Sequence, residues 1–209
     1  MYTETIRDRL AVIERHVRPP RSVLDVGCVD ARPQRDGSAA RIQRKPNLLH
    51  KRLKELNPEL VGVDFDAEGV SVLNAMGFNV VQADVETMQL GRRFDTIVAG
   101  EIIEHLLNPG RALRNLREHL KDDGVLILST PNPFYSAQVW KIWRYGRPSV
   151  NEGHMGWQDP ITLQQLLRAS GLEPVEGYWI QPAGKLLKTW KRWLRPYFSH
   201  SFLCLAKKV

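Results

Sequence analysis

The chain has 209 residues, of which 43% are hydrophobic and 25% are charged, and its formal net charge is +7. This composition excludes a disordered chain, and the length fits a single folded domain spanning residues 1–209. Two cysteines are too few for a disulfide-stabilised secreted domain, and no apolar run is long enough for a transmembrane segment, so we expect a cytoplasmic protein. The positive charge favours an anionic partner, such as nucleic acid, a phosphorylated substrate or a membrane surface.

Apolar periodicity predicts helices and strands that alternate along the chain. An N-terminal helix is expected over residues 3–17 of an N-terminal segment 1–20. Strands are predicted at 22–27, 60–64, 80–81, 96–99, 124–130, 173–180 and 202–206, helices at 48–56, 68–76, 108–120 and 162–169, and a loop at 30–46. Because helices must cover both faces of a parallel sheet, this order predicts an α/β, Rossmann-like three-layer sandwich. Its mostly parallel sheet would have seven strands and end in a C-terminal antiparallel hairpin.

Two segments interrupt this alternation and are predicted to be substrate-side insertions. In residues 131–160, the aromatic side chains either form an acceptor-binding surface or pack as a lid. These side chains are Tyr135, Trp140, Trp143 and Tyr145. In residues 181–200, the stretch 185–195 combines an apolar helical face with Lys and Arg. We expect it to pack on its own domain, with peripheral contact to an anionic membrane as the alternative.

Acidic residues stand at the ends of three successive predicted strands. Asp25 lies two positions before Gly27 at the end of the first of these strands, and Asp64 and Asp84 follow the next two. The carboxyl ends of parallel strands form the binding edge of such a sheet, and a glycine there lets a ligand approach the backbone. An acid at this edge can accept hydrogen bonds from ribose hydroxyls or face the amine of adenine. The pattern predicts a nucleoside-containing ligand.

These strand ends also resemble a known family. Residues 23–28, 62–64, 83–85 and 94–97 look like the successive motifs of class I, Rossmann-like S-adenosylmethionine-dependent methyltransferases. The resemblance implies an enzyme that binds S-adenosylmethionine, with its methionine part, ribose and adenine near the first, second and third acid. It implies the following cofactor-binding residues: Asp25, Gly27, Cys28, Asp64, Phe65, Asp84, Val85, Gly100 and Glu101. The chain departs from the family pattern after Cys28, where Val29, Asp30 and Ala31 replace further glycines.

A second cluster follows the fourth strand at residues 101–105. If these residues form one helical turn, Glu101, Glu104 and His105 share a face. With His154, they are predicted to bind a divalent cation, Mn²⁺ or Mg²⁺. Without a metal, the catalytic residues would be Glu104, His105 and His154, with a histidine as the base. The Glu-x-x-Glu-His pattern is similar to that of ubiquinone-biosynthesis O-methyltransferases and small-RNA 2'-O-methyltransferases, in which it contributes to a metal site.

The predicted function is therefore methyl transfer to a hydroxyl of a glycan or another small biosynthetic metabolite. The chain resembles the ubiquinone and glycan type of O-methyltransferase at residues 101–109 and 130–134. Two alternatives stay open at this point. One is a metal-dependent RNA 2'-O-methyltransferase, and the other is a non-catalytic cofactor-binding or scaffold protein.

Overall fold

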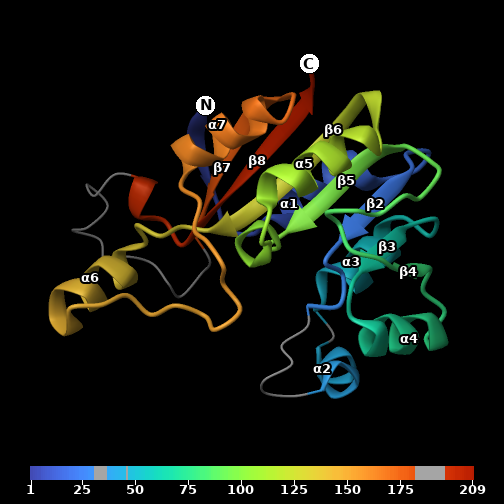
Figure 1. Ribbon diagram of the computed structural model, residues 1–209, viewed down its shortest axis with the longest axis horizontal. Helices are drawn as coiled ribbons and strands as arrows, with labels where there is room; N and C mark the ends of the chain where they lie inside the picture. The colour runs from blue at the N-terminus through green and yellow to red at the C-terminus, as the bar shows by residue number, and fades with distance from the viewer. Residues whose placement is uncertain (31–36, 46, 182–195) are drawn as a thin grey trace.

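The computed structural model describes residues 1–30, 37–45, 47–181 and 196–209, which form a mixed eight-stranded sheet between layers of helices (Figure 1). The strands are β1 (Tyr2–Ile6), β2 (Val23–Val26), β3 (Val61–Asp64), β4 (Val80–Gln82), β5 (Phe94–Gly100), β6 (Leu120–Pro131), β7 (Leu172–Ile180) and β8 (Ser201–Lys208). Their order is β1-β7-β8-β6-β5-β2-β3-β4. Strand β8 is antiparallel to both β6 and β7, and all other pairs are parallel. The predicted fold class is confirmed, including the antiparallel hairpin of β7 and β8.

The additional strand is β1, and it corrects the expected N-terminal helix. Residues 2–6 pair in parallel with β7 at the edge of the sheet, and helix α1 begins only at Leu10. The ring of Tyr2 packs 5.3 Å from the Trp179 ring, between centroids, and lies against Gly177, where a Cβ atom would approach it to 2.7 Å. The apolar spacing of this segment fitted a helix, but edge pairing and the burial of an aromatic ring decide its structure.

Helices cover both faces of the sheet. The helices of the described residues are α1 (Leu10–Val17), α2 (Ser38–Arg44), α3 (Leu49–Leu56), α4 (Ala67–Ala75), α5 (Pro109–Glu118), α6 (Ser136–Tyr145) and α7 (Pro160–Ala169), with short 3-10 helices η1 (Ile103–His105) and η3 (Pro196–Phe198). Apolar side chains of α5 and α7 join one buried cluster with the sheet, and those of α1 and α3 join another. These two clusters establish the three layers. Helix α2 lies in the segment 30–46, where only a loop was expected.

Local sequence explains where several of these elements begin. Strand β2 is buried at every position, as expected for a central parallel strand with a continuous apolar run. Helix α7 begins with Pro160 after a capping box in which the Asp159 carboxylate accepts from the backbone of Thr162. Helix α5 begins at Pro109 after Asn108, at the predicted boundary.

The structure describes the two segments predicted to be insertions to different extents. Helix α6 lies in the first of them, extends away from the sheet (Figure 1) and has no buried residue. Trp140 is 52% exposed and Trp143 is 80% exposed, so the expectation of a packed lid is wrong for these residues. The stretch 185–195 of the second insertion lies outside the described residues.

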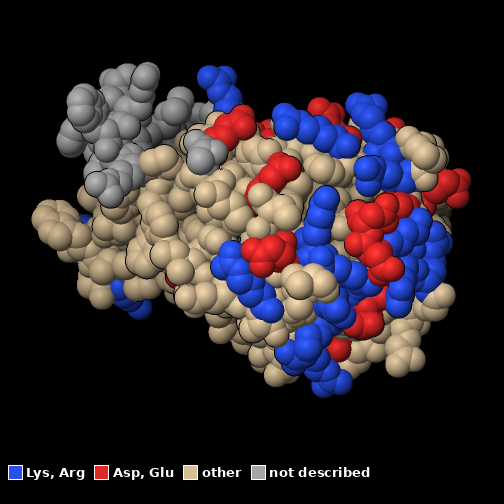
Figure 2. Space-filling model, turned by 90° about the horizontal axis from the view of Figure 1, so that it is seen from above, with Lys and Arg blue, Asp and Glu red and all other residues tan. Residues whose placement is uncertain are grey.

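Charge is distributed unevenly over the surface. On the face seen in Figure 2, Lys and Arg gather with interspersed acids toward the end away from α6, and the part near α6 is largely uncharged. Within the described ranges, we find no helix with the length and apolar character needed to cross a membrane.

Candidate functional site

A cavity of about 590 Å³ opens where strands β2, β5 and β6 end. Several residues predicted for the cofactor or the catalytic site line it: Asp25, Gly27, Cys28, Gly100, Glu101, Glu104, His105 and His154. This is the edge at which parallel α/β sheets bind ligands. The volume lies within the range of roughly 300–1,000 Å³ that small-molecule sites have.

The turn after β2 forms one wall of this cavity. Gly27 has a φ angle of +73°, and its N–H donates to the Val63 carbonyl at 2.9 Å. A Cβ atom at Gly27 would lie 2.8 Å from Ile102 Cδ1, so the turn tolerates only glycine without rearrangement. The buried Asp25 carboxylate accepts a hydrogen bond from His50 Nδ1 at 2.9 Å. The first predicted motif is therefore a rigid turn that exposes backbone to the cavity.

The second predicted acid is placed differently. Asp64 is 5% exposed and does not line the cavity. Its carboxylate accepts from the backbone N–H of Val29 at 2.9 Å and of Asp66 at 3.0 Å. Burial raises the pKa of Asp64, and these hydrogen bonds partly offset the effect. In this arrangement Asp64 joins the turns that follow β2 and β3.

The remaining predicted cofactor residues also lie outside the cavity. Asp84 is exposed and accepts from the Glu86 N–H at 2.8 Å, in a local turn. Phe65 is 71% exposed, and Val85 is buried in the apolar core. The structure thus brings the first half of the predicted cofactor site together with the catalytic cluster, and it leaves the second half beside the cavity.

Arg9 lines the cavity although the sequence pattern did not single it out. It lies just before α1, and its guanidinium donates to Ser129 Oγ at 2.9 Å and pairs with Glu101 at 3.4 Å. Its placement depends on β1, which the helical interpretation of residues 3–17 had concealed. A strand expected before Leu10 would have indicated that Arg9 stands at the binding edge.

Glu101 does not belong to a helical turn with Glu104 and His105, contrary to our expectation. Its φ angle is +57°, and its N–H still donates to the Ser129 carbonyl on β6 at 2.8 Å. The 3-10 helix η1 begins later, at Ile103. Glu101 therefore faces Arg9 and stands apart from the other predicted metal ligands.

Glu104, His105 and His154 form the chemical cluster of the cavity. Ligand atoms of these three residues lie within 4.8 Å of one another. The Glu104 side chain is only 1% exposed, and its carboxylate accepts from Thr130 Oγ1 at 3.0 Å. Burial raises the pKa of Glu104 to about 7, and the nearby charge of Glu101 adds to this effect. A carboxyl group with this pKa exchanges protons readily near neutral pH.

The loop that carries His154 is held by the backbone of Glu104. The Glu104 carbonyl accepts from the N–H groups of Met155, at 2.8 Å, and Gly156, at 3.2 Å. These bonds bring residues 151–157 over η1, although they are about fifty positions later in the sequence. No local pattern predicts such a contact, because it joins the short 3-10 helix η1 to a loop far away in the sequence.

Hydrogen bonds define how the ring nitrogens of the two histidines are used. His105 Nδ1 lies 2.8 Å from the Gly153 carbonyl, which can only accept, so Nδ1 bears a proton, and in the neutral form of the ring Nε2 has the lone pair. Trp157 Nε1 can only donate, and it lies 3.1 Å from His154 Nδ1, so His154 has its proton on Nε2. The two rings meet edge to face with centroids 4.8 Å apart. The cluster thus offers a basic nitrogen from His105 and a donor from His154.

This donor set suits proton transfer better than metal binding. Glu104 and His105 Nε2 are available as metal ligands, but Nδ1 of His154 accepts from Trp157 and Nε2 bears the proton. A cation would have to displace one of these protons or break the Trp157 hydrogen bond to use three ligands.

Sequence comparison identifies relatives of this chain. A family model described as a methyltransferase domain matches residues 2–176. The chain is 31% identical to a ubiquinone biosynthesis O-methyltransferase of Cereibacter sphaeroides over 145 residues, which cover 62% of this chain and 57% of the relative. A protein of the same name from Rickettsia prowazekii is 31% identical over 84 residues, covering 40% of this chain and 31% of the relative. The chain thus spans about a third to just over half of the length of these relatives.

Structure comparison finds the same fold in solved proteins. A SAM-dependent methyltransferase from Archaeoglobus fulgidus superposes with a TM-score of 0.65 at 17% identity, covering 96% of this chain and 91% of the other. Magnesium protoporphyrin IX methyltransferase from Synechocystis, solved with bound SAH, gives a TM-score of 0.62 at 15% identity, with coverages of 96% and 79%. At these identities the likeness establishes the fold alone.

Proposed function

Since the chain belongs to the S-adenosylmethionine-dependent methyltransferases of class I fold, we propose that it methylates a hydroxyl group of a small biosynthetic metabolite or glycan. The observation that carries the proposal is the cluster of Glu104, His105 and His154 within the cavity at the strand ends. Oxygen as the acceptor atom is supported by the names of the curated relatives.

The side chains on the cavity wall support S-adenosylmethionine as the ligand of this cavity. Arg9 and Lys45 are cations on its wall that suit the carboxylate of the methionine part. Asp25 and Glu101 are acids on the same wall that suit the ammonium and sulfonium charges, and the turn at Gly27 lets the ligand approach the backbone. Asp64, Phe65, Asp84 and Val85 stay proposals for the adenosine part, because they stand beside the cavity. When bound, this cofactor supplies a methyl group on a positively charged sulfur.

The residues of the cluster have complementary tasks in this reaction. An acceptor hydroxyl must lose its proton as its oxygen bonds to the methyl carbon, and a base within hydrogen-bond reach takes that proton. His105 Nε2 has the lone pair for this step, and Glu104, with a pKa of about 7, is a second acceptor beside it. The Nε2–H of His154 can donate to the acceptor oxygen and orient it. Most of the rate enhancement would come from this alignment.

A divalent cation at Glu104, His105 and His154 is the second possibility for the same cluster. The spacing of the three ligand atoms favours it, and the proton on His154 opposes it. A bound cation would lower the pKa of the acceptor hydroxyl and replace the general base. Activity that a chelator abolishes and Mn²⁺ restores would establish this variant of the mechanism.

The proposal is tested first by cofactor binding and then by methyl transfer. Calorimetric titration with S-adenosylhomocysteine should give binding that Asp64→Ala weakens, whereas Asp122→Ala, at an exposed position, should leave it unchanged. Methyl transfer to phenolic and sugar hydroxyls should then be lost in a variant combining Glu104→Gln with His105→Gln that still binds the cofactor product. Absence of binding would favour the non-catalytic alternative. Full activity of the doubly substituted variant would remove the roles assigned to both residues.

A further inference from the structure

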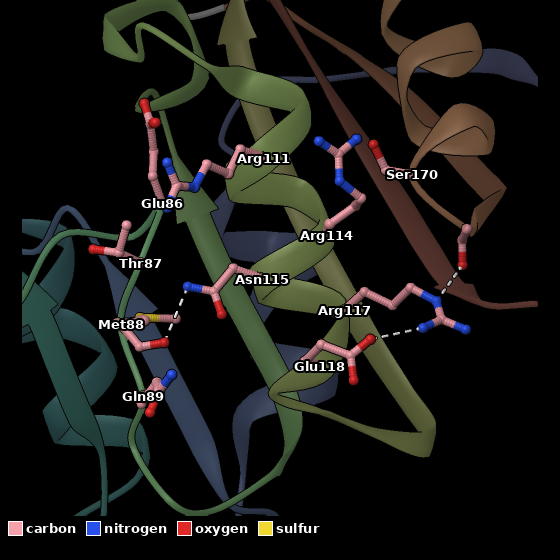
Figure 3. A pocket seen from close by; sticks show the side chains of 11 residues that line it. Glu86, Thr87, Met88, Gln89, Arg111, Arg114, Asn115, Arg117, Glu118 and Ser170 are labelled. Atoms are coloured by element: carbon pink, nitrogen blue, oxygen red, sulfur yellow. Dashed lines mark hydrogen bonds and ion pairs between the residues drawn. The ribbon is translucent and has the colours of Figure 1, made fainter.

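A second hollow, which we call the α5 groove, lies between helix α5, the loop at residues 86–89 and the end of helix α7 (Figure 3). It has a volume of about 610 Å³ and shares no lining residue with the cavity at the strand ends. The main side chains on its α5 side are Arg111, Arg114, Asn115 and Arg117. The groove is therefore a separate site, and a ligand bound there would not depend on the proposed methyl transfer.

Hydrogen bonds hold the walls of the α5 groove in place. Asn115 Nδ2 donates to the carbonyls of Val85, at 2.9 Å, and Met88, at 3.1 Å, which fixes the loop against α5. On the other side, Arg117 Nε donates to the Gly171 carbonyl at 3.0 Å, which fixes the end of α7 (Figure 3). Hydrogen bonds thus hold the loop and the end of α7 against helix α5, so a ligand would meet a preformed site.

Two arginines of the groove have no partner among the described residues. Arg111 and Arg114 are three positions apart, so they stand on one face of α5, and neither side chain makes a hydrogen bond or an ion pair with the described residues. The acids of the groove are already engaged. Glu86 accepts from the backbone and side chain of Asn108, each at 2.9 Å, and Glu118 pairs with Arg117 at 2.9 Å. Two cationic groups are left facing the groove without a fixed counter-charge.

An unpartnered buried hydroxyl lies at the same place. Ser170 is only 3% exposed, it lines the groove, and its Oγ has no hydrogen-bond partner. Figure 3 shows this oxygen on the side of Ser170 that faces the Arg114 guanidinium. Buried hydroxyl groups nearly always have a partner in native proteins, so an orphan donor at the edge of a cationic groove points to an acceptor supplied from outside.

We propose that the α5 groove binds the phosphate group of a small anionic ligand through Arg111, Arg114 and Ser170. Arginine guanidinium groups bind phosphate oxygens with paired hydrogen bonds, and a phosphate has enough oxygens to bind both arginines and the serine hydroxyl together. A carboxylate has only two oxygens and would be satisfied by one arginine. The tetrahedral anion therefore matches the donor set better than an acidic side chain does.

Calorimetric titration of the full chain with pyrophosphate tests this proposal. We expect saturable binding that Arg114→Gln weakens by about tenfold, because a charged paired contact is lost. Ser170→Ala should weaken it by roughly threefold without harming the fold, since its hydroxyl has no partner to lose. Arg93→Gln, at an exposed arginine outside the groove, is the matched control and should bind as the wild type does.

Two results of these titrations would overturn the proposal: no saturable binding, or binding that the substitution of both groove arginines leaves unchanged. A single-stranded oligonucleotide that binds where pyrophosphate does not would overturn it too, and would indicate a polyanion surface. Titrations with ATP and with a sugar phosphate identify the source of the phosphate, because the extra affinity of one over pyrophosphate reports contacts beyond the phosphate group.

Discussion

Replacing Glu104 by Gln should make the protein more stable at alkaline pH. The carboxyl is 1% exposed, and burial raises its pKa from 4.5 to about 7. Because the pKa is higher in the folded state, protonation of Glu104 stabilises the fold fully below the unfolded-state pKa of 4.5. This stabilisation is lost as the pH rises toward 7. At 1.36 kcal/mol per pKa unit, the folded protein loses on the order of 3 kcal/mol over this window. Glu104→Gln has no proton to lose and should keep this stability.

Urea denaturation in the presence of a chelator measures this difference between pH 4 and pH 8.5. Below pH 4.5 the wild type and Glu104→Gln should have similar unfolding free energies, and above pH 7 the variant should be more stable by about 3 kcal/mol. Glu55→Gln, at a surface side chain that is 68% exposed, controls for the loss of a charge and should follow the wild type. Parallel curves for wild type and Glu104→Gln across the whole range would refute the argument that burial governs this carboxyl.

Two further substitutions test the packing. Gly69→Ala should destabilise the protein by about 2 kcal/mol despite the higher helix propensity of alanine, because the new Cβ atom would lie 2.1 Å from Val29 Cγ1. Gly110→Ala is the control: its new Cβ atom would make ordinary contacts at 3.6 Å, and it should stabilise the protein by about 0.5 kcal/mol. Equal effects on the thermal midpoint would contradict this. Asn57→Ala should destabilise the protein by about 3 kcal/mol, because the buried side-chain amide of Asn57 donates hydrogen bonds to two backbone carbonyls. Asn79→Ala, at an exposed position, should leave the unfolding free energy unchanged. A similar unfolding free energy for both asparagine variants would exclude this role.

The sequence predicted the central sheet well because its strands are buried on both faces. A continuous apolar run such as that of β2 has few other structures open to it in a chain of alternating helices and strands. At the sheet edge the pattern was ambiguous. Strand β1 depends on pairing with β7, which lies more than 160 positions away, and a helical period in residues 3–17 could not reveal that partner.

In the candidate site too, the sequence predicted the residues placed by local structure and missed those placed by contacts between distant segments. Gly27 and the Glu104–His105 pair could be found because each lies within a few residues of the end of a strand, at an edge where parallel sheets bind ligands. The position of Glu101 could not be found, because its φ of +57° departs from the helical turn that its spacing suggested. Arg9 and Trp157 were missed because each reaches the cavity through a contact between distant segments, and only the fold brings those segments together.

The pairing of β1 with β7 has a consequence for how the cavity is completed during synthesis. Arg9 is translated before the strands that support it, because β1 pairs with β7, and β7 pairs on its other side with β8, residues 201–208. The side of the cavity that Arg9 forms is therefore completed only after a segment that is translated nearly two hundred residues later. A nascent chain that has not reached residue 201 lacks β8, the strand that joins β7 to β6, and therefore lacks the sheet order that brings Arg9 to the cavity.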